Sequence, residues 1–405
     1  MNVEEVVRDV LREQAEGQPP AGPGFAERVL TARRRRRARR VVSVAVATAA
    51  VVVGVAVAVP ITGSGEGDVR PAGVVERRDV HAHPDQSPPR DMVAAGDVAL
   101  AAYYTSEVVE RSESVGVAER TYHLLDPRSG RYEEDDRWSF VAVAPGLKTA
   151  AVLERELPAR RIGLLDLATG EVETWIPVEH GVGGLAFSPD GKRLVATAYA
   201  ENPDLREPVE GEKGKDWMGR FGEPNRLGFH LVELSSGKST WSPVESRDDI
   251  NFREDFAFGA DGTTVWSRVV PGDSVRQYHD LTGKEIPAPA AERHLVWDAL
   301  AGLSPDGALA AGGLGREAGE KAYTDLLDPR SGKRVAEVRG SGAMAWADER
   351  RLITWERLPG SGTDTYRPRM VLVTVGSEKV VPLTGVREPN QTLARTEWEP
   401  VFAER

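Results

Sequence analysis

The 405-residue chain contains no cysteine. This absence excludes disulfide bonds, thiolate zinc sites, iron–sulfur clusters and cysteine nucleophiles, so any part outside the cytoplasm must be held by its core alone. The sequence also lacks the G-x-S-x-G pattern, which excludes the nucleophile elbow of an α/β-hydrolase domain. Its histidines show no metal-ligand spacing except His81-Ala-His83, and we interpret that pair as incidental because it falls in a polar stretch. No cofactor and no metal are expected.

Charge is divided unevenly along the chain. Residues 1–61 contain 10 Arg against 6 Asp and Glu, a net charge of +4, whereas the remainder contains 42 basic against 57 acidic residues, a net charge of −15. The two parts therefore face different surroundings. An acidic domain repels nucleic acid and anionic lipid headgroups, so we expect no nucleic-acid partner.

A run of 19 uncharged residues, Val41 to Val59, approaches the ~20 apolar residues that cross a bilayer as a helix. Arginines precede the run, and by the positive-inside rule they stay on the cytoplasmic side. The sequence thus predicts a cytoplasmic segment over 1–40, one span of the plasma membrane over 41–61 and an extracytoplasmic remainder. The arginines that set this topology are Arg33, Arg34, Arg35, Arg36, Arg37, Arg39 and Arg40.

The sequence leaves two alternatives to a retained membrane span. Ala56-Val57-Ala58 fits the A-x-A pattern of a cleaved signal peptide, although the apolar run is longer than the roughly 7 to 15 residues usual there. A nucleic-acid arm is the other interpretation of the arginine run. Its position directly beside the apolar span makes membrane topology the simpler cause.

A short amphipathic helix is predicted near the N-terminus. Apolar residues follow the i, i+3, i+4, i+7 and i+8 spacing of one helix face at Val3, Val6, Val7, Val10 and Leu11. We interpret Val3, Val7, Val10 and Leu11 as a candidate docking surface for a cytoplasmic regulator. The alternative is a segment that merely lies on the membrane.

The layout of residues 1–61 combines that acidic helix with a Pro/Gly-rich hinge over 17–24, the run from Phe25 to Leu30 and the arginine cluster. It resembles membrane proteins that accompany extracytoplasmic-function sigma factors in actinobacteria. The resemblance implies that a sigma factor is the cytoplasmic partner.

Residues 62–90 are rich in Gly, Pro and charge and predict a flexible linker. Beyond the linker, two short elements alternate. The first is an apolar strand, a turn of Asp-Gly type and a second strand, because Asp-Gly supplies the positive φ of a tight hairpin. Its clear copies are at 185–195, 256–265 and 301–310, and its weaker copies are at 141–146, 92–97 and 344–348.

The second element is a strand ending in Asp or Glu, followed by a turn closed by Ser/Thr-Gly. It recurs at 124–130, 164–170, 231–237, 278–283 and 326–332, with a degenerate copy at 373–377. Successive turns of the first element are 50, 45, 71, 45 and 41 residues apart, near the ~40 to 50 residues of a propeller blade apart from one insertion.

The phrase Phe-Ser-Pro-Asp-Gly-Lys at 187–192 resembles the repeats of WD-repeat-like and TolB-like β-propellers. The resemblance implies an all-β fold over 91–405 with about six four-stranded blades. Strands are also predicted at 74–80, 392–397 and 398–403, and together they would build a composite seventh blade that closes the ring.

The insertion at 201–226 is the one long departure from the repeat. Loops held on a rigid scaffold concentrate binding residues, so Trp217, Met218 and Phe221 are candidate partner-binding residues. His180 is a fourth, since its connection would open on the same face. The alternative is a loop folded down on its own aromatic residues. The acidic run at 133–136 lacks the glycine and alternating ligands of a calcium loop and predicts a solvated turn.

We therefore expect a non-enzymatic, membrane-tethered extracytoplasmic binding or scaffolding module with a protein or cell-envelope ligand. A transmembrane signalling protein is the second interpretation. A propeller hydrolase with acidic groups around its channel is the third, and no catalytic motif supports it.

Overall fold

The structure is a computed structural model, and it describes residues 79–211, 214–220, 225–244, 253–268, 276–296, 299–318, 321–358, 367–387 and 395–405. All regular elements in these residues are strands, so the predicted all-β class is confirmed. The described residues include no helix with the length and hydropathy of a membrane span. The predicted N-terminal helices, arginine cluster and span lie outside the described residues.

Within this part of the chain, the strands form six repeated units. The first unit comprises β26 (Arg395–Glu404), β3 (Val98–Ser112), β4 (Val115–Asp126) and β5 (Arg131–Asp135), and the second comprises β6 (Trp138–Val143), β7 (Thr149–Glu154), β8 (Ala159–Asp166) and the first half of β9 (Glu171–Phe187). The third unit comprises the second half of β9, β10 (Arg193–Tyr199), β13 (Arg226–Glu233) and β14 (Lys238–Pro243), and the fourth comprises β15 (Ala257–Phe258), β16 (Thr264–Arg268), β17 (Arg276–Asp280) and β18 (Glu285–Ile286). The fifth unit comprises β19 (Ala310–Ala318), β20 (Lys321–Leu327) and β21 (Arg334–Arg339), and the sixth comprises β22 (Ser341–Trp346), β23 (Arg351–Leu358), β24 (Arg367–Thr374) and β25 (Val380–Val386).

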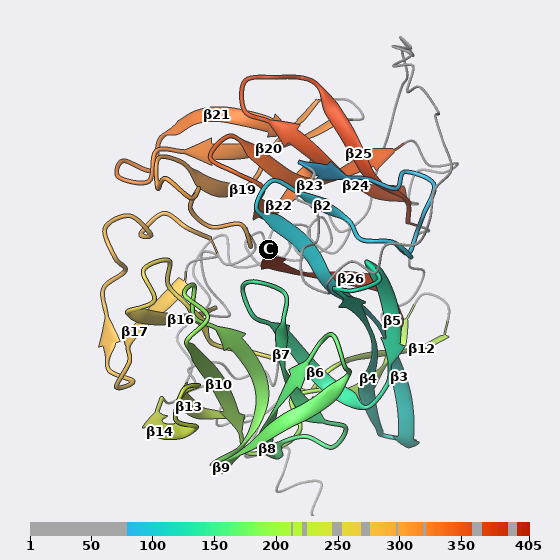
Figure 1. Cartoon of the computed structure of the whole chain (residues 1–405), viewed down its shortest axis with the longest axis vertical. Helices are drawn as coiled ribbons and strands as arrows, with labels where there is room; N and C mark the ends of the chain where they lie inside the picture. Colours follow the sequence, from blue (N-terminus) through green and yellow to red (C-terminus); the bar gives the residue numbers. More distant parts are fainter. Residues whose placement is uncertain are drawn as a thin grey trace, which may run out of the picture.

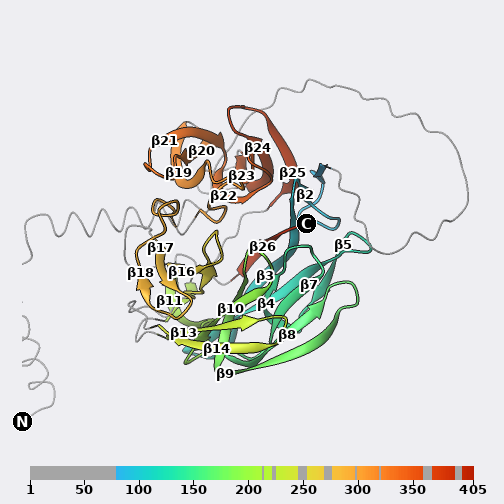
Figure 2. The ribbon, with the colours of Figure 1, turned by 60° about the vertical axis from the view of Figure 1, so that its left-hand side comes forward.

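These units are antiparallel sheets that lie around a common centre (Figure 1). The second and third units share a 7-stranded sheet, because β9 pairs with β8 through its first half and with β10 through its second. The fifth unit has three strands, and the single bridge Leu303–Ala310 lies where a fourth would be. Figure 2 shows the fifth and sixth units on one side of the molecule and the first three on the other.

The turns follow the chemistry that the repeats predict. Gly191 and Gly307 have φ of 66° and 67°, the left-handed region that glycine tolerates and that Asp-Gly hairpins require. The two Ser-Pro-Asp-Gly copies make the same hydrogen bond: Ser188 Oγ donates to Asp190 Oδ1 and Ser304 Oγ donates to Asp306 Oδ1, both at 2.6 Å. The predicted turns therefore set the boundaries of the inner hairpins.

Both ends of the described chain are incorporated into sheets. The C-terminal strand β26 pairs antiparallel with β3, so it is the inner strand of the first unit. Near the other end, β1 (Val80–His81) pairs with β2 (Ala94–Ala95), and His83 bridges to Thr384 on the outer edge of the sixth unit. The terminal strands therefore extend existing units, and the described residues contain no separate seventh unit of the predicted composite kind.

The core lies between neighbouring units. Buried apolar clusters join the first unit to the second, the second to the third, the third to the fourth, the fifth to the sixth and the sixth to the first. No such cluster joins the fourth unit to the fifth among the described residues, where Arg276 Nη2 instead donates to Ala299 O at 3.1 Å. The repeated sheets are thus confirmed, but a closed propeller ring is not shown.

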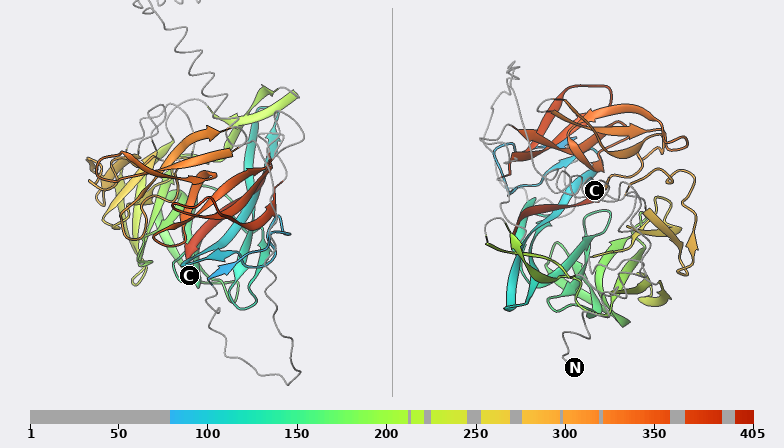
Figure 3. Two further views of the ribbon diagram at one scale, coloured as in Figure 1. Left: turned by 90° about the horizontal axis from the view of Figure 1, so that it is seen from above. Right: turned by 180° about the vertical axis from the view of Figure 1, so that it is seen from behind.

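The predicted insertion contributes a hairpin, β11 (Leu205–Gly211) and β12 (Gly214–Gly219). Leu205 and Arg206 of β11 pair with Val117 and Gly116 of β4. The insertion from the third unit therefore crosses to the first unit and extends its sheet beside the far ends of β3 and β4 (Figure 3).

Candidate functional site

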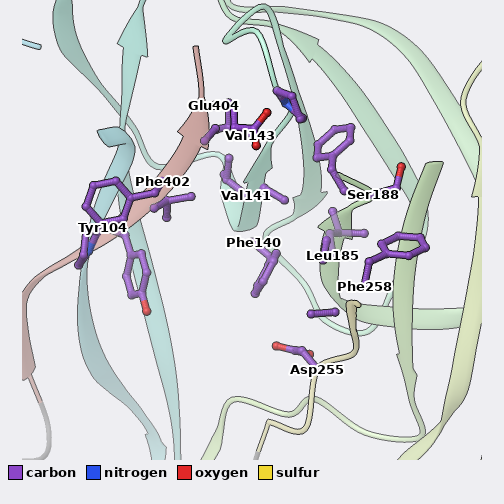
Figure 4. Close-up of a pocket in the computed structure, with 18 of the residues that line it drawn as sticks. Tyr104, Phe140, Val141, Val143, Leu185, Ser188, Asp255, Phe258, Phe402 and Glu404 are labelled. Carbon is purple, nitrogen blue, oxygen red and sulfur yellow. The ribbon is translucent and has the colours of Figure 1, made fainter. Parts of the chain in front are cut away.

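A cavity of about 530 Å³ lies between the inner strands of the first four units. Those strands are β26, β6, the second half of β9 and β15, and three of them are copies of the first repeated element. The cavity wall is largely apolar and aromatic. Its lining includes Tyr104, Phe140, Val141, Ala142, Leu185, Phe187, Ala257, Phe258 and Phe402 (Figure 4).

Polar groups mark two ends of the cavity. Asp255 lies at one end with Arg120 and Arg253, and Glu404 lies at the other, as Figure 4 shows for the two carboxylates. The segment that carries Arg253 and Asp255 directly precedes β15. The polar end is thus assembled from sequence positions more than a hundred residues apart.

Arg120, Asp204 and Arg253 form a buried ion cluster at that end. Arg120 Nη1 and Nη2 donate to the two oxygens of Asp204 at 2.7 and 2.9 Å, and Arg253 Nε and Nη2 donate to the same oxygens at 2.7 and 2.6 Å. Asp204 is 2% exposed, and it comes from the insertion immediately before β11. The Asp204 carboxylate therefore links a guanidinium group of the first unit to one in the segment that precedes the fourth unit.

Burial alone would raise the pKa of Asp204, but the Arg253 and Arg120 guanidinium groups outweigh burial and hold that pKa well below its usual range. Burial also raises the pKa of Tyr104 at the cavity wall. At neutral pH, Asp204 is therefore ionised and Tyr104 protonated. The Arg120 pKa is raised because Asp204 more than offsets burial and the repulsion from Arg253.

Asp255 joins the cluster to the cavity. Its Oδ1 accepts a hydrogen bond from Tyr199 Oη at 2.8 Å, and its Oδ2 accepts one from Arg253 Nη1 at 3.1 Å. A Cβ atom added at Gly184 would lie 2.0 Å from Asp255 Oδ1. The absence of a side chain at Gly184 therefore lets this carboxylate approach the start of the third unit.

Two of the three predicted partner-binding residues of the insertion lie on β12. Trp217, on β12, is 7% exposed, and its ring packs against Gly116 with Lys215 Nζ 4.4 Å from the ring centroid. Met218 follows it and is partly buried. Phe221 lies outside the described residues. Trp217 thus covers the sheet of the first unit, and a partner contact by these residues stays a prediction.

His180 lies in a different cluster, with His230 and Trp241 of the third unit. Its ring stacks on Trp241 at 4.0 Å between centroids, and its backbone N donates to His230 Nε2 at 3.2 Å. Burial, together with the neighbouring His180, lowers the pKa of His230 to about 4. The structure does not bring His180 and Trp217 into contact with each other or with the ion cluster.

The acidic run at 133–136, which we predicted to be a solvated turn, lies instead largely in strand β5. It borders a second cleft of about 370 Å³, which is also lined by the turn between β8 and β9. Glu133 and Glu134 are exposed there. The described residues contain no group of three or more His, Asp or Glu residues placed to hold a metal ion. The docking residues Val3, Val7, Val10 and Leu11 and the arginines at 33–37, 39 and 40 lie outside the described residues.

Sequence reasoning missed the central cavity and the cluster of Arg120, Asp204 and Arg253. The recurring apolar strands before each Asp-Gly turn were a signal for the cavity, since they are its inner strands. No sequence signal pairs Asp204 with Arg120, because the pairing depends on how the insertion crosses to the first unit. The fold and site therefore define an all-β protein of repeated sheets around a central cavity.

No protein-family model matches the chain, and no curated protein matches it. Among solved structures, TolB from Acinetobacter baumannii is similar at a TM-score of 0.39 and 17% identity over 75% of this chain and 67% of that chain. A chain of a mitotic checkpoint complex is similar at 0.39 and 13% over 82% and 90%, and a chain of Kuenenia stuttgartiensis hydrazine synthase at 0.35 and 13% over 62% and 68%. Similarities this low do not indicate what the chain binds.

Proposed function

We propose that this chain is a membrane-tethered, non-enzymatic binding module whose ligand occupies the central cavity. In this proposal the six units form a β-propeller of the TolB-like and WD-repeat-like kind, residues 41–61 span the plasma membrane, and the domain lies outside the cytoplasm. The observation that carries the proposal is the cavity of about 530 Å³ with an apolar wall and a few convergent polar groups. Pockets of this size and composition are typical of ligand sites.

Two groups at the polar end of the cavity are poorly suited to proton transfer. A general acid or base works best with a pKa near the working pH. Asp204 has a pKa far below neutrality and accepts bonds from two guanidinium groups, whereas the raised pKa of Tyr104 keeps its hydroxyl protonated. These groups hold one charge state and one geometry, which suits recognition of a ligand.

Ligand capture by the full-length protein in detergent tests the proposal. The protein is incubated with an extract of the cell envelope, washed, and analysed by native mass spectrometry. Ala142→Phe combined with Ala257→Phe would fill the cavity with two aromatic rings, and the exposed Glu154→Gln is the matched control. The proposal predicts a ligand mass on wild type and control that the filled variant lacks. Identical spectra for the filled variant would contradict it.

Transmembrane signalling is a second candidate, favoured by the apolar stripe at Val3, Val7, Val10 and Leu11 beside the predicted span. A docking surface loses affinity when a charge is buried unpaired in it. Val7→Asp and Leu11→Asp should therefore abolish recovery of a cytoplasmic partner, such as a sigma factor, with the membrane-inserted chain. Unchanged recovery with both substitutions would remove the support for this function.

A further inference from the structure

We propose that the central cavity selects a ligand with an apolar or aromatic body and a cationic head, and that Asp255 binds the head. This inference rests on the proposed binding function and names the ligand class of the same cavity.

The guanidinium groups at the polar end are committed to the protein. Arg253 donates through Nε and Nη2 to Asp204, and through Nη1 to Asp255 and to Gly183 O, the last at 2.5 Å. Arg120 donates to Asp204 and to Ser139 O. An anionic ligand would have to compete with these charge-assisted, buried bonds. The two arginines are therefore positioning residues for the carboxylates.

Asp255 has capacity that the arginines lack. Each of its oxygens accepts one described hydrogen bond, and a carboxylate offers about four lone-pair positions, so roughly half remain free. Its side chain is 24% exposed, compared with 15% for Arg253, 9% for Arg120 and 2% for Asp204. Among these four charged side chains, the most exposed is an acceptor. At this end of the cavity, Asp255 is therefore the charged group most open to a ligand.

The surrounding charge also favours a cation. Around the cavity, Arg120, Arg253 and the nearby Arg206 are matched in number by Asp204, Asp255 and Glu404, so the local charges balance and the charge of the whole domain decides the sign. Residues 62–405 carry a net charge of −15, and a field of one sign in a cleft concentrates ligands of the other sign. Between the carboxylates at the two ends of the cavity lie Phe140, Phe258 and Phe402, which provide the apolar contact for the body of the ligand.

Two fluorescent probes with the same aromatic body test the inference on the full-length protein in detergent. Dansylcadaverine carries a primary ammonium group, whereas dansylglycine carries a carboxylate. We expect dansylcadaverine to bind at least about tenfold more tightly, because a hydrogen bond between charged groups contributes that much or more. Asp255→Asn should abolish this preference, whereas Glu154→Gln at the surface should leave it unchanged.

Each outcome separates the ligand class from the binding function. Equal binding of the two probes to wild type, or tighter binding of dansylglycine, overturns the ligand class. Even then, loss of both probes in the filled variant Ala142→Phe/Ala257→Phe would support the central cavity as a binding site. Loss of both probes in Asp255→Asn would indicate that this variant is misfolded. In that case the preference of wild type is measured at rising salt: a preference due to charge weakens with salt and supports the ligand class, whereas a constant preference overturns it. Failure of both probes to bind wild type overturns the inference, while the envelope capture judges the binding function independently.

Discussion

Asp204 is the residue on which the polar end of the cavity depends. Replacing it by Asn removes the charge that Arg120 and Arg253 share, which leaves the buried Arg120 without a carboxylate partner and Arg253 with Asp255 alone. Breaking a buried ion pair in this way costs about 3 to 5 kcal/mol. We therefore expect Asp204→Asn to lower the free energy of unfolding by that amount in urea titrations.

Glu154→Gln is the matched control for this prediction. Glu154 pairs with Arg161 at 2.6 Å, but both side chains are more than 40% exposed, and such surface pairs contribute under about 1 kcal/mol. An Asp204→Asn variant as stable as Glu154→Gln would show that the cluster does not hold the units together.

His230 should make the stability of the domain depend on pH. Its Nε2 accepts a hydrogen bond from His180 N, and burial together with His180 lowers its pKa to about 4 from an ordinary value of 6.5. The unfolded chain therefore takes up the proton first, and stability that is complete above pH 6.5 is lost as the pH falls toward 4, by about 2 to 3 kcal/mol.

The measurement is the unfolding midpoint of wild type and His230→Gln at pH 7.5 and 5.0. Gln keeps an acceptor for His180 N but does not titrate, so the midpoint of the variant should fall less between the two pH values. An equal fall in both proteins would assign the pH dependence to other groups.

Individual turn residues could be predicted from the sequence because their chemistry is local. Asp190 and Gly191 fix a hairpin through bonds that span only a few residues, so a short pattern identifies them. Asp204 could not be predicted, because its partners Arg120 and Arg253 are 84 and 49 residues away in the sequence. Long-range ionic partners follow from the path of the chain, which no local pattern gives.

At the scale of elements, one type of contact links successive units. Arg120 of β4 donates to Ser139 O, Arg226 of β13 to Glu254 O, and Arg276 of β17 to Ala299 O. In each case an arginine from the third strand of a unit reaches a backbone carbonyl of the next unit. These arginines are 5 to 9% exposed, so each satisfies a buried backbone carbonyl at the junction between two units.

Trp398 on β26 contacts both the first and the sixth unit. This side chain is fully buried, contacts Tyr103 and Trp355 edge-on at 5.8 and 5.4 Å between centroids, and donates through Nε1 to Ser87 Oγ. We expect Trp398→Ala to lower the free energy of unfolding by about 3 to 5 kcal/mol, as for other buried tryptophans. Urea titration measures this effect.

The control for Trp398 is Trp175→Ala. Trp175 is only partly buried and lies beneath the exposed Arg161 at 4.1 Å, so its loss should cost clearly less. Equal losses for the two variants would mean that β26 contributes no more than a surface contact. In that case the inner strand of the first unit would not be a structural requirement.

The elements were predictable where the repeat is regular. Alternating apolar strands and Asp-Gly or Ser/Thr-Gly turns identify the hairpins of the second, third, fourth and fifth units. The position of β26 in the first unit, and the crossing of β11 to β4, were not predicted. Strand partners far apart in sequence depend on closure of the whole assembly, and the period of the repeat does not specify them.

At the scale of the whole molecule, the weakest junction described is that between the fourth and fifth units. The other neighbouring units share buried apolar clusters, whereas this pair is linked by the hydrogen bond of Arg276 to Ala299 O. An apolar interface stabilises in proportion to its buried area. We therefore expect local opening at this junction first, with faster hydrogen exchange in β17 and β18 than in β9 and β10.

The proposed topology places the binding domain outside the cytoplasm and residues 1–40 inside it. Its most direct measurement uses a reporter that is active only in the cytoplasm, fused in turn before Met1 and after Arg405 of the full chain. The arginines before an uncharged run predict activity for the first fusion and none for the second. Activity of the second fusion would place the domain inside the cell and contradict the account.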